Sequence, residues 1–95
     1  MKESALEAKM RGIVRSKGGL CLKWVSPGFT GVPDRIVFLP KGKIIFVEVK
    51  RPGLKDGRSV RQKRVAQILT RLGQKVITVN SAEEFEEFID EIQAL

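Results

Sequence analysis

Two short segments of this sequence place charged side chains where a small domain would normally pack apolar ones. Pro33-Asp34 opens one run of strand-forming residues, and Glu48-Val49-Lys50 closes the next. Mg²⁺ and Mn²⁺ prefer oxygen ligands such as carboxylates, and a nearby lysine can orient a water molecule or offset negative charge. The two segments therefore predict a divalent-metal site with a lysine beside it.

The turn between the two runs sets which side chains face each other. Pro40-Lys41-Gly42 suits a three-residue hairpin loop, because proline presets φ at the first position and glycine accepts a left-handed backbone at the last. Leu39 then faces Lys43, and Asp34 faces Glu48 on the same side of the sheet. A two-residue loop would send the two acids to opposite sides. Opposed carboxylates have Cβ atoms about 5 Å apart and repel unless a cation lies between them.

Each of these residues also has an ordinary structural explanation. Asp34 could start a strand or cap a loop, and Glu48 with Lys50 could form a solvent-facing pair on an edge strand. Ile44 and Phe46 share a face with Glu48, which argues against an open edge. The combination of PD, thirteen intervening residues and EVK favours the metal site over these alternatives.

The rest of the pattern predicts the elements that position these residues. Ser59 with Gln62, and Ser81 with Glu84, are capping-box signals for two helices. The order αβββαβα predicts an α/β fold with a mixed sheet, in one domain over residues 1–95. The predicted elements are a helix over 2–17, strands at 20–26, 34–39 and 43–50, a helix over 59–73, a strand at 75–79 and an acidic helix from 81.

Composition narrows the possible chemistry. The chain has no histidine, which excludes His-ligated zinc sites and Ser-His-Asp triads, and Cys21 is its single cysteine. It contains no apolar run of 18 residues and no signal-peptide pattern, so we expect a soluble, cytoplasmic protein that does not associate with membranes.

Charge is strongly segregated along the chain. The net charge is +7, yet all 18 lysines and arginines lie in residues 1–80 with only five of the 11 acids. This asymmetry favours a polyanionic partner on a basic face, although a solvated surface is the alternative. The bases that we expect to contact DNA are Lys23, Arg35, Arg51, Lys55, Arg58, Arg61 and Lys63.

Taken together, these segments resemble the VRR-NUC branch of the PD-(D/E)XK nuclease superfamily, in its small stand-alone form from phages and bacteria. The likeness covers almost the whole chain, through "ALEAKM", "KWVSPGFTGVPDRIVF", "KIIFVEVKRPG" and "SVRQKRVAQILTRLGQKVITVNS". The resemblance implies a restriction-endonuclease-like αβββαβ core with a mixed central sheet flanked by helices, plus a C-terminal acidic helix. It also implies Mg²⁺- or Mn²⁺-dependent hydrolysis of DNA, without a nucleotide cofactor.

The resemblance implies a role for each matching residue. Asp34 and Glu48 would be metal ligands, joined by the backbone carbonyl of Val49. Lys50 would be the catalytic lysine, and Gln62 the motif glutamine that lies near the active site.

The same resemblance implies that the first helix supplies an acidic residue to the metal site. Glu7 fits this role best, but Glu3 stays open, because residues four apart share one face of a helix.

The resemblance also implies a homodimer that acts on Holliday junctions or other branched DNA. Two other functions stay open on the sequence: a non-catalytic DNA-binding module, and a sequence-specific or RNA-directed nuclease on the same fold.

Overall fold

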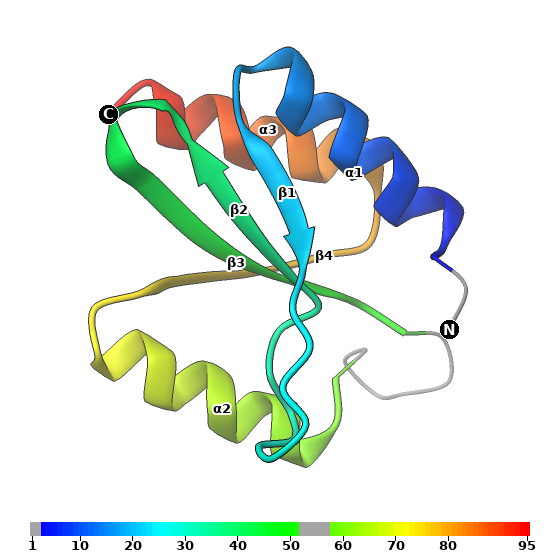
Figure 1. The fold of residues 1–95 in the computed structure, drawn as a ribbon, viewed down its shortest axis with the longest axis vertical. Helices are drawn as coiled ribbons and strands as arrows, with labels where there is room; N and C mark the ends of the chain where they lie inside the picture. Colours follow the sequence, from blue (N-terminus) through cyan, green and yellow to red (C-terminus); the bar gives the residue numbers. More distant parts are fainter. Residues whose placement is uncertain (1–2, 52–57) are drawn as a thin grey trace.

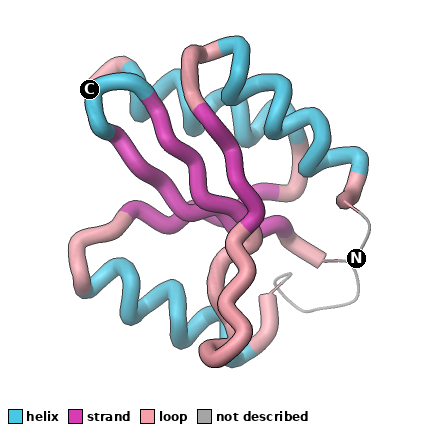
Figure 2. Tube along the Cα trace, in the orientation of Figure 1, coloured by secondary structure: helices cyan, strands magenta, loops and turns pink. Residues whose placement is uncertain are grey.

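A computed structural model describes residues 3–51 and 58–95 of the chain. Its four-stranded sheet lies between two helical layers, with α1 and α3 on one face and α2 on the other (Figures 1 and 2). The elements are α1 (Ala5–Ser16), β1 (Leu20–Lys23), β2 (Arg35–Leu39), the 3₁₀ turn η1 (Pro40–Gly42), β3 (Lys43–Val49), α2 (Val60–Arg71), β4 (Lys75–Val79) and α3 (Ala82–Gln93).

The sheet is mixed, in the order β1-β2-β3-β4. The first three strands are antiparallel, whereas β3 and β4 are parallel and are connected through α2. This arrangement confirms the predicted α/β fold, including the C-terminal helix.

The hairpin register is the one that the turn residues predict. Leu39 pairs with Lys43, and the ladder continues to Arg35 opposite Val47. Lys41 adopts a left-handed conformation in the turn, with φ of 68°, and Gly42 does so too, with φ of 74°. Because the register is fixed in this way, Asp34 enters β2 beside the end of β3 that carries Glu48.

Helices α2 and α3 each begin directly after the serine that caps them. The Ser59 hydroxyl accepts from the Gln62 N–H, and the Gln62 side chain accepts from the Ser59 N–H, so the predicted capping box is confirmed at α2. At α3 the Ser81 hydroxyl accepts from the Glu84 N–H, but the Glu84 carboxylate accepts from the N–H of Asn80 instead. The first of the two predicted boxes is therefore complete, and the second is displaced by one residue.

The main core lies between the sheet and the α1/α3 layer. Alternate residues of each strand face it, which is the expected result of the two-residue strand period. Its fully buried members include Met10, Val14, Val37, Val47, Val79, Phe85 and Ile89. None of the helices in the described ranges is long and apolar enough to cross a membrane.

Helix α2 covers the opposite face of the sheet incompletely. Leu20, Leu22, Phe38 and Ile44 remain exposed there, by 53, 44, 38 and 42%. The register places Leu20 beside Phe38 and Phe38 beside Ile44, so these side chains form an apolar surface across three strands.

Candidate active site

Asp34 is anchored at the point where β2 meets the end of β3. Its Oδ2 accepts a hydrogen bond from the Val49 N–H at 2.7 Å, and its Oδ1 pairs with the Arg51 guanidinium. The preceding Pro33 is buried, and the Asp34 carbonyl accepts from the Trp24 N–H, which ties the backbone to the end of β1. The carboxylate is therefore held by one backbone N–H and one guanidinium, and the main chain of Asp34 is held by β1.

A cavity of about 180 Å³ brings Asp34 together with Glu7 of α1. Two of the predicted DNA-contacting bases, Lys23 and Arg51, also line it. The structure thus gathers two carboxylates and two cations from four separate segments of the sequence. The remaining residues around this cavity are Ser4, Trp24, Val32 and Pro33.

Arg35 lies on the core side of the sheet and holds the N-terminal end of α1. It is only 4% exposed, its Nε donates to Glu7 Oε1 at 2.9 Å, and its Nη2 contacts Glu3. Burial alone would lower the pKa of the Arg35 guanidinium, but hydrogen bonds to Glu7 and Glu3 outweigh it and raise the pKa above its usual value. Because the Arg35 guanidinium is buried and pairs with two carboxylates, it is not part of the DNA-binding surface that we propose.

Strand phase gives the signal that could have placed Arg35 from the sequence. It is separated by two and four residues from Val37 and Leu39, which are both buried against the core. Residues in that phase point to one face, so the strand period predicts that Arg35 points inward with them.

Glu48 is fully buried on the α2 side of the sheet. It stands opposite Thr78 in the parallel β3–β4 ladder, and the Arg58 Nη1 lies 3.6 Å from its Oε2. Glu48 does not line the cavity that holds Glu7 and Asp34. The hairpin thus brings Asp34 to the end of β3 that carries Glu48, while Glu48 itself lies outside the cavity of Glu7 and Asp34.

Lys50 directly follows β3 and is exposed to solvent, whereas the Gln62 side chain is hydrogen-bonded at the start of α2. Lys50 is exposed, and its N–H donates to the Val79 carbonyl at 2.8 Å, which continues the ladder beyond β3. The Gln62 side chain is used in the α2 cap, and it lines a hollow together with Arg51 and Arg61. Arg51 thus borders both this hollow and the cavity of Asp34.

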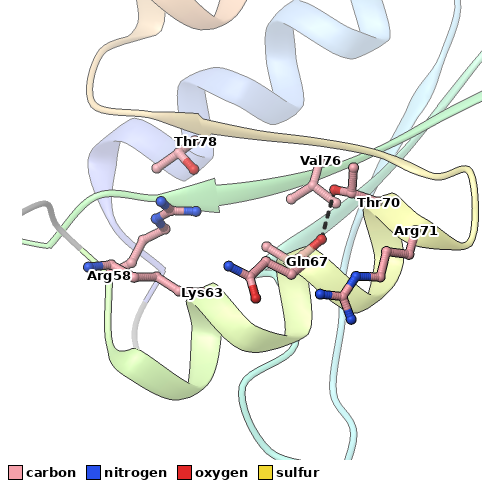
Figure 3. Close-up of a pocket in the computed structure, with 8 residues that line it drawn as sticks. Arg58, Lys63, Gln67, Thr70, Arg71, Val76 and Thr78 are labelled. Carbon is pink, nitrogen blue, oxygen red and sulfur yellow. Dashed lines mark hydrogen bonds between the residues drawn. The ribbon is translucent and has the colours of Figure 1, made fainter.

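The other predicted DNA contacts surround the start of α2. Arg61 donates to the Thr30 carbonyl at 3.0 Å, and its guanidinium lies 4.8 Å from the centre of the Phe29 ring. Arg58 and Lys63 line a separate hollow between α2 and β4 (Figure 3). Lys55 lies outside the described residues.

The donor chemistry of the site fits a hard divalent cation. The predicted ligands supply only oxygen: the carboxylates of Glu7, Asp34 and Glu48 and the carbonyl of Val49. Across residues 3–51 and 58–95, however, no three acidic or cysteine side chains lie close enough together to hold a metal ion as they stand. Each carboxylate lies beside an arginine instead, so positive charge already balances the acids.

Known proteins resemble this chain in sequence and in fold. It is 47% identical over 81 residues to "Putative nuclease p44" of Acyrthosiphon pisum secondary endosymbiont phage 1, and the match covers 85% of both chains. Its structure is similar to a solved structure titled "VRR_NUC domain", with a TM-score of 0.79, 30% identity and 90% of each chain covered. No family model matches the sequence.

Proposed function

The chain belongs to the VRR-NUC family of nucleases, and from this premise we propose that it is a metal-dependent endonuclease selective for branched DNA. The observation that carries the proposal is the meeting of Asp34 and Glu7 in one cavity with Lys23 and Arg51. Acids that can hold a cation and bases that can hold a phosphate are both needed for phosphodiester hydrolysis. Here they share one space at the end of β3.

Asp34 and Glu48 would hold Mg²⁺ or Mn²⁺, with the Val49 carbonyl and with Glu7 from α1. When bound, such an ion polarises a phosphate oxygen and lowers the pKa of an attacking water. The exposed ammonium of Lys50 would offset the negative charge that develops on the phosphate, and Gln62 would fix the start of α2 beside it.

The bases near the site would position the DNA backbone. Lys23 and Arg51 line the cavity of Asp34, Arg61 projects near Phe29, and Arg58 and Lys63 border α2. Contacts of this type bind phosphates and carry little sequence information. They support selection of DNA by shape rather than by base sequence.

A homodimer would match this proposal to branched DNA. A four-way junction has approximate twofold symmetry, and a twofold dimer would present two active sites to it. The exposed apolar surface of Leu20, Leu22, Phe38 and Ile44 supplies a face that a second copy could cover.

The test is a cleavage assay on four-way junction, flap, linear duplex, single-stranded DNA and RNA in Mg²⁺ or Mn²⁺. Asp34→Asn and Glu48→Gln should each lower cleavage by about 10³-fold or more, because they remove ligand charge while keeping side-chain shape. Glu87→Gln, an exposed residue of α3, is the matched control and should cleave as wild type does.

Titration calorimetry with Mn²⁺ gives a second measurement that does not depend on turnover. Binding should weaken in Asp34→Asn and Glu48→Gln, and excess EDTA should stop cleavage by the wild-type protein. Cleavage that continues in EDTA would refute the metal-dependent mechanism. Tight DNA binding without cleavage of any substrate would favour the non-catalytic DNA-binding module.

A further inference from the structure

A second hollow, of about 480 Å³, lies between α2 and β4 on the face of the sheet that carries Glu48 (Figure 3). Arg58 and Thr78 lie at one end of it and Arg71 at the other, with Gln67 between them. The residues that line it are Arg58, Lys63, Ala66, Gln67, Thr70, Arg71, Val76 and Thr78.

The lining of this hollow suits an anion. Three of its eight described lining residues are cations, and none of the eight is acidic. Gln67 and Thr78 add neutral hydrogen-bonding groups, whereas the Thr70 hydroxyl already donates to the Ala66 carbonyl at 2.8 Å. A small ammonium and two planar guanidinium groups are the side chains that bind phosphate oxygens most often.

The hollow adjoins Glu48, one of the predicted ligands of the proposed active site. Thr78 is the β4 partner of Glu48, and Arg58 both lines the hollow and lies 3.6 Å from the Glu48 carboxylate. A strand that is cut near Glu48 could therefore run directly into it.

The length of the hollow fits several nucleotides. Lys63 and Arg71 are eight residues apart on α2, which corresponds to about 12 Å along the helix axis. B-form DNA rises about 3.4 Å per nucleotide along its helix axis, so a strand that follows α2 would pass three to four base-pair steps over this span. A single inorganic phosphate would leave most of the lining groups unused.

We propose that this hollow binds the phosphodiester backbone of one DNA strand a few nucleotides from the cleaved bond. Arg71 and Gln67 form its distal contact, and Arg58 with Lys63 forms the contact nearest the site. The inference rests on the proposed nuclease function, because that function supplies the strand. It adds two residues, Arg71 and Gln67, that the spacing of the sequence motifs does not single out.

The first experiment measures binding in EDTA, so that it does not depend on cleavage. Fluorescence anisotropy is recorded with labelled branched DNA over a range of salt concentrations, for wild type, Arg71→Ala, Gln67→Ala and Arg15→Ala. Arg15 is an exposed arginine in the last turn of α1, a helix on the opposite face of the sheet, and so is the matched charge control.

We expect Arg71→Ala to weaken binding by about three- to tenfold and to reduce the slope of log K against log salt by about 0.7–0.9, the value for one lost phosphate contact. Gln67→Ala should weaken binding without changing the slope, because it carries no charge. Arg15→Ala should leave both quantities unchanged, and thermal unfolding should confirm that each variant is folded.

The second experiment locates the contact on the strand. Single uncharged methylphosphonate linkages are placed at successive positions on either side of the cut site, and each DNA is titrated with wild type and Arg71→Ala. One linkage, a few nucleotides from the cut, should abolish the difference between the two proteins.

Three results would overturn the inference while leaving the nuclease proposal intact. They are wild-type DNA affinity in both Arg71→Ala and Gln67→Ala, an equal loss in Arg15→Ala, and binding of inorganic phosphate or a mononucleotide as tight as that of DNA. If the wild-type protein binds no DNA at all, the proposed function fails as well.

Discussion

At the scale of single residues, each carboxylate of the proposed metal site is accompanied by an arginine. A guanidinium supplies the positive charge that a divalent cation would otherwise bring to a carboxylate. The arginines differ in exposure, since the side chain of Arg51 is 48% exposed and that of Arg35 only 5%. An exposed arginine can exchange its partner at small cost, whereas a buried one cannot. The three pairs are Glu7–Arg35, Asp34–Arg51 and Glu48–Arg58.

Arg51 should therefore compete with the metal for Asp34. We expect Arg51→Ala to tighten Mn²⁺ binding by about three- to tenfold in the absence of DNA, because the carboxylate no longer has to give up an ion pair. The same variant should bind DNA more weakly, since it loses a phosphate contact. Calorimetry with Mn²⁺ and anisotropy with DNA measure the two effects separately. Arg71→Ala serves as the control, with weaker DNA binding and unchanged Mn²⁺ binding; equal or weaker Mn²⁺ binding by Arg51→Ala would contradict the competition.

At the scale of elements, the N-terminal end of α1 is joined to the sheet by charge. The Ser4 hydroxyl accepts from the Glu7 N–H, while Glu3 and Glu7 both contact Arg35 at the start of β2. Glu3 also forms an ion pair at 2.7 Å with Arg11, which lies eight residues further along the chain, in α1. Glu7 faces the cavity of Asp34, so the same contact that positions the helix also brings an acid to the proposed active site.

Glu7 lines the cavity of Asp34 and Glu3 does not, so neutralising the two acids should have different effects. Glu7→Gln should lower cleavage strongly, because Glu7 lines the cavity with Asp34, whereas Glu3→Gln should retain most of the activity. Cleavage of the same junction substrate at saturating Mg²⁺ measures both. A severe loss in Glu3→Gln with normal activity in Glu7→Gln would instead assign the metal-site acid to Glu3.

Glu3 should act mainly on stability, and its effect should depend on pH. The hydrogen bond from Arg11 lowers the pKa of Glu3 below its ordinary value of 4.5, with Arg35 contributing in the same direction. Its stabilising effect is therefore fully present above pH 4.5 and is lost as the pH falls through the lowered pKa. Urea unfolding of wild type and Glu3→Gln should show a difference at pH 7 that disappears in strong acid. A difference that grows on acidification would contradict this assignment.

At the scale of the whole molecule, the two faces of the sheet are unequal. Helices α1 and α3 together cover one face, while α2 alone packs on the other (Figure 1). An apolar surface across β1, β2 and β3 is left exposed beside α2. Contiguous apolar surfaces of this kind often mark protein–protein contacts. A second copy bound there would bring two active sites into one particle, as the proposed action on junctions requires.

Phe38 lies in the middle of that surface, between Leu20 and Ile44. We expect wild-type protein to have the mass of a dimer in light scattering, and Phe38→Asp to have that of a monomer, because a charge at the centre of an apolar contact cannot be solvated. Junction cleavage by Phe38→Asp should fall more than cleavage of linear duplex. Val25→Asp is the control, since Val25 is 70% exposed but lies outside the strands. A wild-type monomer would contradict the proposed dimer.

The sequence alone was sufficient for features that depend on neighbouring residues. The Pro40–Gly42 turn sets the register of the hairpin, and serine caps set the starts of α2 and α3. Strand and helix periods then predict the order of the elements and the apolar face of each. These features are local because turn geometry and capping hydrogen bonds involve residues within about four positions.

The way in which side chains from distant elements combine depends on how those elements pack. Strand phase permits Arg35 to point inward, but the packing of α1 makes it a partner of Glu7. The hollow with Arg71 exists because α2 lies against β4, a contact that no spacing in the sequence encodes. A charged side chain takes its role from whichever groups surround it in space, and those surroundings are set by the packing of whole elements.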